Sequence, residues 1–322
     1  MNKFEEQFNS FIPELTKALS IPNSTEWTVK GFIDYYKNIY SISADTKVVS
    51  KIIELMIFPK FIEFAKKYNY EMKLSPHQNY YPDMTFIDGN KNRYAVDLKS
   101  TYRVSESNVN GMTLGAFTGY FRNRDSKKNV LYPYGSYEKH YVFGIIYSRS
   151  DIYNAEEYFR ELGIALTATQ KKELIAYMND STEENWNEFL QCLAKKGISS
   201  KIDKNRIDAM LVTETDVYNM ENYQSIRSVV RDFDYFIQEK WRLAVDRPGS
   251  GNTKNIGSES KIEILKKGTG LFYKEYKEKG IEVFDSYWTN YETKEMAKAD
   301  GKEKASFNNL ESYKKWVDNL KK

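Results

Sequence analysis

The fold is decided by residues 81–99, which read YPDMTFIDGNKNRYAVDLK. Segments 84–87 and 93–98 follow a two-residue period and are rich in β-branched and aromatic side chains, which is typical of strands. The sequence DGN at 88–90 between them favours a turn. The stretch therefore predicts a β-hairpin.

Amphipathic helices are expected before this hairpin. Apolar residues at helical spacing predict a first helix that ends before Pro22. A second, longer helix is expected to be capped by Asp45 or Thr46, to be interrupted near Pro59 and then to resume.

Strands and helices continue after the hairpin. Further strands are expected at 141–148, 233–237 and 241–245, and the composition from 151 to about 208 is helical. Helices flanking a mixed sheet indicate an α/β (α+β) fold with an inserted helical subdomain.

Composition limits the classes of function. No apolar run approaches the ~20 residues of a membrane span. The acidic, amphipathic N-terminus is unlike a signal peptide, so we expect a cytoplasmic protein without a membrane partner. One cysteine, Cys192, excludes an internal disulfide framework and a cysteine-rich metal site, and two histidines, His77 and His140, argue against a histidine zinc site. Any metal would therefore be held by oxygen ligands.

Charge is distributed unevenly along the chain. The 48 Lys and Arg and 45 Asp and Glu residues give a net charge of +3. Residues 151–239 hold 17 acids and 10 bases, a net charge of −7, which leaves +10 on the rest. This pattern fits an acidic insertion into a polyanion-binding protein, although any single charged run also fits a solvated loop.

The hairpin carries the residues best placed for chemistry. Residues two apart on a strand share a face, so Asp97 and Lys99 project together, and the hairpin brings Asp83 beside them. Two carboxylates and a lysine suit a Mg²⁺ site in which the lysine orients a water that attacks a phosphodiester. An acid two residues before a lysine occurs at eight positions, so an exposed ion pair on an edge strand is the alternative.

Two further features have more than one interpretation. Glu54 lies in the apolar run IIELMIF, where it is either a partnered buried carboxylate or a solvent-facing one. Segment 248–258, PGSGNTKNIGS, lacks the GK[ST] ending of a phosphate loop, so nucleotide binding is weakly supported. It is otherwise a flexible linker, or a DNA-reading loop in which Asn252 pairs with adenine and the Thr253 methyl contacts thymine.

Eight short segments, spread over about two thirds of the chain within 43–149 and about 217–316, are similar in sequence and in order to segments of one known protein family. They are SADTKVVSKIIEL, HQNYYPDMTF, AVDLKSTY, TLGAFTGYFRN, YPYGSYEKH, PGSGNTKNIGS, FDSYWTNYE and ESYKKW. Together they resemble the EcoRV-type family of type II restriction endonucleases, in the PD-(D/E)xK nuclease superfamily. The resemblance implies a restriction-endonuclease-like mixed β-sheet flanked by helices. Residues 151–216 have no counterpart in these segments.

The resemblance implies roles for the catalytic residues. Asp83 and Asp97 would bind the metal together with the Leu98 carbonyl, and Lys99 would be the catalytic lysine. Glu54 would be the acidic residue on the helix next to the active site, associated with metal binding and dimer contacts. The implied cofactor is Mg²⁺, for which Mn²⁺ would substitute.

The resemblance also implies contacts with double-stranded DNA. Base recognition is assigned to Gly249, Ser250, Gly251, Asn252 and Thr253 in the major groove and to Gln78 and Asn79 in the minor groove. Phosphate contacts are assigned to Thr101, Thr118, Lys128, Arg149 and Asn255. His77 stands where the family has a glutamine and Gly119 where it has a serine, so both positions depart from the family pattern.

The implied activity is Mg²⁺-dependent double-strand cleavage at a short palindrome, expected to be GATATC, with blunt ends and 5′-phosphate products. A homodimer suits a palindrome because each subunit reads one half-site. A cognate DNA methyltransferase of the same bacterial restriction-modification system would be a functional partner. The alternatives are a repair or junction nuclease with the same carboxylate-lysine site and a catalytically inactive sequence-specific DNA-binding protein.

Three regions are expected along the chain. Residues 1–150 would form the first part of the catalytic and dimerisation domain, and 217–322 the recognition loop and the rest of the nuclease domain. Residues 151–216 would be the acidic helical insertion. We expect this insertion to be a solvated cap, because a net negative charge repels phosphate.

Overall fold

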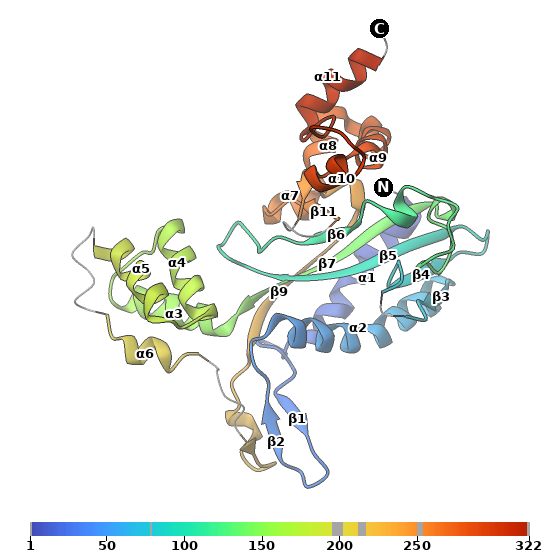
Figure 1. Cartoon of the computed structure of the whole chain (residues 1–322). Helices are drawn as coiled ribbons and strands as arrows, with labels where there is room; N and C mark the ends of the chain where they lie inside the picture. The colour runs from blue at the N-terminus through green and yellow to red at the C-terminus, as the bar shows by residue number, and fades with distance from the viewer. Residues whose placement is uncertain (1, 78, 195–201, 212–216, 250–253, 321–322) are drawn as a thin grey trace.

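The computed structural model describes residues 2–77, 79–194, 202–211, 217–249 and 254–320, and a five-stranded mixed sheet lies at its centre (Figure 1). The strand order is β3-β4-β5-β7-β9, in which β5 and β7 are parallel and the other neighbours are antiparallel. The strands are β3 (Glu71–Leu74), β4 (Met84–Ile87), β5 (Arg93–Tyr102), β7 (Lys139–Arg149) and β9 (Val230–Glu239). The predicted hairpin is confirmed as β4 and β5, and the mixed α/β class is also confirmed.

Two N-terminal helices, α1 (Lys3–Leu19) and α2 (Thr46–Tyr68), cover one face of this sheet (Figure 1). Their aromatic side chains interlock with the sheet. The Phe8 ring lies 4.8 Å from that of Phe64 on α2 and 5.2 Å from that of Phe143 on β7. Large buried rings supply much of the hydrophobic stabilisation of a core, so the packing of α1 and α2 stabilises this face of the sheet.

Helix α2 runs through Pro59 without a break, so the predicted interruption is wrong. A proline inside a helix removes one N–H and displaces the carbonyl four residues earlier, here that of Leu55. Pro59 and Leu55 both lie on the exposed side of α2, where water can satisfy the freed carbonyl. The predicted cap is confirmed, since Asp45 Oδ1 accepts hydrogen bonds from the backbone N–H groups of Lys47 and Val48.

The opposite face carries a small sheet and the C-terminal helices (Figure 1). The small sheet has the order β10-β11-β6, with β6 (Thr113–Ala116), β10 (Ala244–Pro248) and β11 (Asn255–Ser258). The helices are α7 (Ile262–Lys267), α8 (Leu271–Tyr276), α9 (Gly280–Asn290), α10 (Lys294–Ala299) and α11 (Leu310–Leu320). The strand predicted at 241–245 begins only at Ala244, because the chain leaves the main sheet through the 3₁₀ turn η5 (Lys240–Arg242).

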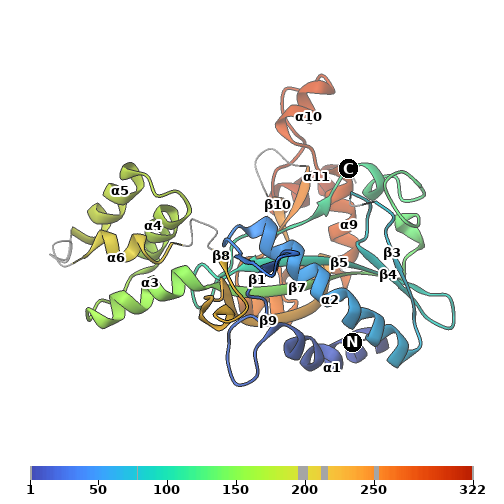
Figure 2. The same cartoon turned by 90° about the horizontal axis from the view of Figure 1, so that it is seen from below.

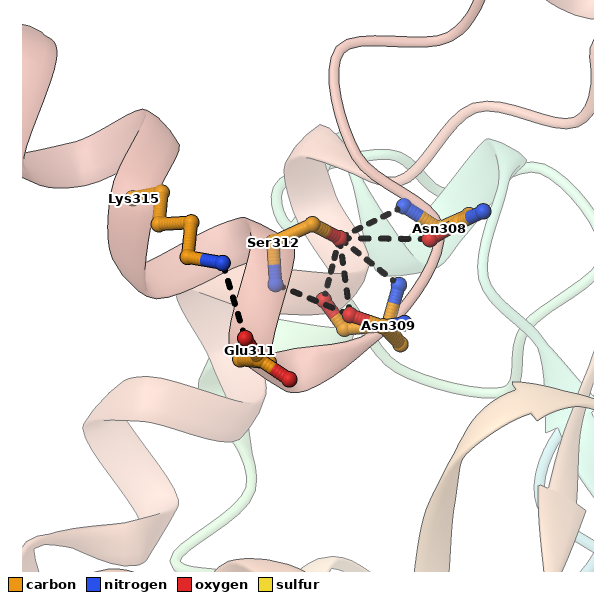
Figure 3. Close-up of polar contacts among 5 residues, drawn as sticks. All are labelled: Asn308, Asn309, Glu311, Ser312 and Lys315. Atoms are coloured by element: carbon orange, nitrogen blue, oxygen red, sulfur yellow. Dashed lines mark hydrogen bonds and ion pairs between the residues drawn. The ribbon is translucent and has the colours of Figure 1, made fainter.

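The last helix is fastened to the small sheet. At the start of α11, Asn309 Oδ1 accepts a hydrogen bond from the Ser312 N–H at 2.8 Å (Figure 3). The next free N–H of this turn, that of Leu310, donates to Asp246 Oδ2 on β10 at 2.9 Å. Side-chain acceptors of this kind satisfy helix N-terminal donors. The C-terminal helices therefore stabilise the strand that leads to Gly249.

The helical region predicted from 151 to about 208 is present as α3 (Ser150–Glu161), α4 (Ala168–Asn179), α5 (Glu183–Ala194) and α6 (Lys204–Asp208). Figures 1 and 2 show these helices grouped at one end of the sheet, where β7 leads into α3. Their buried side chains join the core beneath the main sheet. A third sheet, β1 (Gly31–Ile33), β2 (Ile39–Ser41) and β8 (Val217–Tyr218), projects near this end. Among the described residues, no helix is long and apolar enough to cross a membrane.

Candidate active site

Two aspartates and a lysine lie together at the open end of the β4–β5 hairpin, away from its turn at 88–90. The antiparallel register of β4 and β5 brings Asp83, one residue before β4, beside Asp97. The backbone N–H of Leu98 donates a hydrogen bond to Asp83 Oδ2 at 2.6 Å. Lys99 Nζ forms an ion pair with Asp97 Oδ2 at 2.5 Å. The structure thus brings Asp83, Asp97 and Lys99 together, as their spacing predicts.

The alternative of an exposed ion pair on an edge strand is wrong. Strand β5 lies between β4 and β7, and Asp97 is only 6% exposed. The alternation of β5 points Val96 and Leu98 toward the core under α1 and α2, and Asp97 and Lys99 toward the other face. The core packing of Val96 and Leu98 therefore fixes the part of β5 that carries the Asp97–Lys99 ion pair.

The electrostatics of the pair favour a bound cation. Burial, reinforced by the neighbouring Asp97 carboxylate, raises the pKa of Asp83 from 3.8 to about 7, although Lys99 and the Leu98 N–H act in the opposite direction. Burial alone would lower the pKa of Lys99, but the charges of Asp97 and Asp83 outweigh it and raise that pKa. The lysine is therefore a cation, whereas the charged form of Asp83 is disfavoured in the metal-free protein, a cost that a bound cation would reduce.

Glu54 lies beside this site on α2. Its carboxylate forms an ion pair with Lys51 at 2.8 Å and is partly exposed, and its charge also acts on Lys99. One turn earlier on the same helix, Ser50 Oγ accepts a hydrogen bond from Ser100 Oγ on β5 at 2.7 Å. This bond fixes the face of α2 that carries Glu54 against β5. Glu54 is thus neither buried and partnered in the core nor remote from the site.

The donor set is made of oxygens. Two carboxylates converge, and the Leu98 carbonyl accepts from Lys99 Nζ at 3.4 Å, so this carbonyl faces the same side. Among the described residues, no three His, Cys, Asp or Glu side chains cluster closely enough to hold a metal. Mg²⁺ is commonly bound by one or two carboxylates and several waters, so the residues present fit a Mg²⁺ ion.

Sequence reasoning missed one charged residue near the site, Lys240. This lysine follows β9, is almost completely buried, and interacts electrostatically with Asp97 and Lys99. The available signal was a lysine followed by tryptophan directly after an apolar strand. Without the sheet order, nothing in the sequence connects residue 240 with residue 97.

The residues predicted to read bases are partly outside the described ranges. Ser250, Gly251, Asn252 and Thr253 of the major-groove set and Gln78 of the minor-groove set lie there. Asn79 is exposed, and the ring of His77 contacts that of Tyr80 at 4.7 Å.

The ends of the glycine-rich segment are well defined. The Gly249 N–H donates to the Asn255 carbonyl at 3.1 Å, which closes the base of the segment. A Cβ added at Gly249 would lie 2.8 Å from Thr113 Cγ2 on β6, so a glycine is needed for this close approach. The described ends of the segment are therefore held by the pairing of β10 with β11, whereas residues 250–253, on which the linker and base-reading interpretations depend, lie outside the described residues.

The predicted phosphate contacts divide into two groups. Lys128 is exposed, Thr118 is partly exposed before the 3₁₀ turn η1 (Gly119–Phe121), and Asn255 begins β11. Thr101 is buried, and its hydroxyl donates to the Asn110 carbonyl at 2.6 Å.

Arg149 does not have the environment expected of a phosphate ligand. It is 7% exposed, and its guanidinium is paired with both carboxylate oxygens of Asp151. It also donates to the side chain of Asn179. Asp151 on α3 and Asn179 on α4 therefore neutralise and bury a base that we expected on the DNA-binding surface. The prediction for Arg149 is therefore not supported.

The chain is similar to known restriction enzymes. A family model described as "Restriction endonuclease EcoRV" matches residues 23–181 and 205–318. The chain is 28% identical over 308 residues to the type II restriction enzyme EcoRV of Escherichia coli, an alignment that covers 94% of this chain and 96% of that protein. The family match includes 151–181 and 205–216, so 182–204 is the part of the predicted insertion that the family model leaves unmatched.

Proposed function

The chain belongs to the EcoRV family of type II restriction endonucleases, and from this membership we propose that it is a Mg²⁺-dependent homodimer that cuts both strands of a short palindrome. As a member of this family it is a deoxyribonuclease. The proposed site is GATATC, cut to blunt ends with 5′-phosphates. The observation that carries the proposal is the buried Asp97–Lys99 pair beside Asp83.

The two aspartates would hold the divalent ion. Asp83 and Asp97, with the Leu98 carbonyl, offer oxygen ligands from adjacent strands, and the raised pKa of Asp83 supports a site that gains from added positive charge. When bound, Mg²⁺ would stabilise the negative charge that develops on the phosphate and lower the pKa of water.

Lys99 would act on the nucleophile and the phosphate. Its ammonium is fixed by Asp97 at 2.5 Å, so it would orient the attacking water by a hydrogen bond without a search among rotamers. The same positive charge would stabilise the phosphate in the transition state. Glu54, which is partly exposed and paired with Lys51, would act next to this site rather than as one of the two inner carboxylates.

An exposed apolar surface supports the homodimer. Val48, Leu55 and Ile62 recur every seven residues on α2 and are exposed, and Leu55 reaches 59%. Strand β2 leads into α2, and its hairpin with β1 exposes further large side chains, among them Tyr35 at 93%. Exposed apolar residues that line one face of a helix are typical of an interaction surface, and a seven-residue repeat suits helix pairing. Leu55→Asp should turn a dimer into a monomer in sedimentation velocity; an unchanged dimer would exclude α2 from the interface.

Base reading is proposed for the loop between β10 and β11. Asn252 carries an amide that matches the N6 and N7 edge of adenine, and the central TA step of GATATC is easily kinked. The Asn252 amide alone, or the deformable TA step alone, would discriminate only weakly among DNA sequences. The two together support GATATC as the recognition site.

Plasmid digestion tests the proposal. DNA containing one GATATC site should be cut once with Mg²⁺, and sequencing of the ends should give blunt products with 5′-phosphates. Asp97→Asn, purified in the same way, should not cut and controls for contaminating nucleases. Preference for branched DNA, with no selection among intact sequences, would replace this proposal by a repair or junction nuclease. Binding to the site without cleavage would leave a DNA-binding protein.

A further inference from the structure

Lys240 is a buried lysine whose ammonium has no hydrogen-bond partner among the described residues. It lies in η5, at the end of β9, and is 1% exposed. An unpaired charge is costly in an interior, because the protein replaces the water around it with poorer partners. A lysine at this position therefore requires another source of stabilisation.

Aromatic rings enclose this ammonium. Lys240 Nζ lies 4.5 Å from the ring centroid of Tyr81 and 5.5 Å from that of Tyr134. Tyr120 stacks on the other rings, with its centroid 5.0 Å from that of Tyr81. The faces of aromatic rings are negative and attract a cation, most strongly where water is excluded. The rings thus stabilise a charged lysine.

The backbone of β6 closes the remaining side. A Cβ added at Gly115 would lie 3.4 Å from Lys240 Nζ and 3.3 Å from the Tyr120 hydroxyl. Gly115 also has φ +85°, a conformation that side-chain-bearing residues rarely adopt. The space around the ammonium is therefore shaped by three tyrosines and a glycine, and Lys240 Nζ makes no hydrogen bond to any described residue.

The charges that act on Lys240 come mainly from the active site. Burial lowers the pKa of Lys240 to about 8, Asp97 and more weakly Asp285 act to raise it, and Lys99 acts to lower it. The neighbouring His140 is buried and its pKa is well below the usual value, so it adds no charge. At neutral pH the lysine is thus mostly protonated, and Asp97 is the principal negative group in its field.

Tyr81 connects this lysine with the other aspartate. The ring that holds the ammonium belongs to the residue two positions before Asp83. Its hydroxyl is fixed by a hydrogen bond of 2.9 Å with His140 Nδ1 on β7. The ammonium and the segment that carries Asp83 are therefore held by one side chain.

We propose that Lys240 is a positioning residue, a built-in counter-cation that offsets the repulsion between Asp83 and Asp97 before a divalent ion binds. The inference rests on the proposed metal-binding role of these two aspartates. A fixed positive charge close to carboxylates stabilises them in the metal-free protein. It also repels an incoming divalent ion, so Lys240 weakens metal binding in the absence of DNA.

Removing the charge while keeping the shape tests this inference. Lys240→Met should bind Ca²⁺ without DNA about ten-fold more tightly than the wild type, as measured by calorimetry. Its thermal midpoint should fall in EDTA and rise more steeply with Ca²⁺ than that of the wild type, because tighter binding gives greater stabilisation. Lys240→Arg keeps the charge and should retain the wild-type Ca²⁺ affinity. Lys267→Met, an exposed lysine on α7, controls for the change in net charge.

The outcomes distinguish the metal-binding role of the aspartates from the counter-cation role of Lys240. If the wild type binds no Ca²⁺, or Asp97→Asn binds as well as the wild type, the metal role of the aspartates is refuted and the premise falls. If the wild type binds and Lys240→Met has the same affinity, the counter-cation role is refuted alone. Should Lys240→Met not fold, Lys240→Gln serves as the neutral variant. Neutral variants that fold only with Ca²⁺ support the inference, and variants unfolded in both conditions overturn it.

Discussion

Replacing Asp83 by Asn should stabilise the metal-free protein at alkaline pH. The folded-state pKa of Asp83 is about 7 against an ordinary value of 3.8, because burial and the Asp97 charge disfavour the ionised form. One pKa unit corresponds to ~1.4 kcal/mol, so about three units give up to ~4 kcal/mol. The folded state holds this proton more tightly than the unfolded state, so stability falls as pH rises from about 4 to about 7 and then levels off. Asp83→Asn removes that fall.

The assay is urea unfolding in EDTA, followed by tryptophan fluorescence at intervals between pH 4.5 and 8.5. The difference in unfolding free energy between Asp83→Asn and the wild type should grow with pH and reach its plateau above pH 7. Ca²⁺ at pH 8 should stabilise the wild type more than the variant, because the ion replaces the missing positive charge. The reasoning is refuted if both proteins have the same pH slope.

Asp88 provides a control of opposite sign. Burial acts to raise the pKa of this turn carboxylate, but hydrogen bonds from Asn92 and Asn90 outweigh it, and the pKa is lowered. A lowered pKa contributes stability above the ordinary value, which is lost as pH falls through the folded-state pKa. Asp88→Asn should therefore be less stable than the wild type at neutral pH, and that difference should shrink in acid. If Asp88→Asn instead became more stable than the wild type as the pH rises, the result predicted for Asp83→Asn would not be specific to Asp83.

Three further changes test separate parts of the site. Lys99→Met should lower kcat about 10²–10⁴-fold, a range typical of a positioned proton-transfer group, with DNA binding in Ca²⁺ little changed; equal losses in both would indicate a binding role. Asn252→Ala should lower discrimination against altered sites by ~1–3 kcal/mol in competitive cleavage, and unchanged selectivity would remove this residue from base reading. Gly115→Ala should destabilise the fold by ~1–3 kcal/mol in urea, because of its positive φ and its contacts with Tyr120 and Lys240; a neutral effect would show that β6 yields easily.

Local patterns predicted the hairpin of β4 and β5 well. Both strands around 88–90 were expected from their two-residue period, and β4 has the predicted bounds of 84–87. The convergence of Asp83 with Asp97 followed, because an antiparallel hairpin fixes which residues face each other. The error at Pro59 was of another kind: proline disfavours a helix interior locally, but the packing of Phe61 and Phe64 carries the helix past it.

Features that depend on distant segments were not accessible to sequence reasoning. Lys240 reaches the field of Asp97 because β9 is placed beside β7, and β7 beside β5. Each pairing is a long-range contact that no local period encodes. The same applies to Glu54, whose place next to Lys99 depends on the packing of α2 under β5. Composition could only leave its two interpretations open.

The environment of Arg149 shows how the helices that follow a strand change the role of its last residue. Arg149 ends β7, and α3 begins directly after it, so Asp151 and the Asn179 side chain are the acceptors nearest to the guanidinium. A buried bidentate pair is costly to break, since one charge would be left unpaired in the interior. Arg149 therefore fastens α3 and α4 to the sheet. We therefore propose that the positive charge available to DNA comes from exposed bases such as Lys128. The net charge of +3 thus understates the basic character of the rest of the chain, because residues 151–239 carry a net charge of −7.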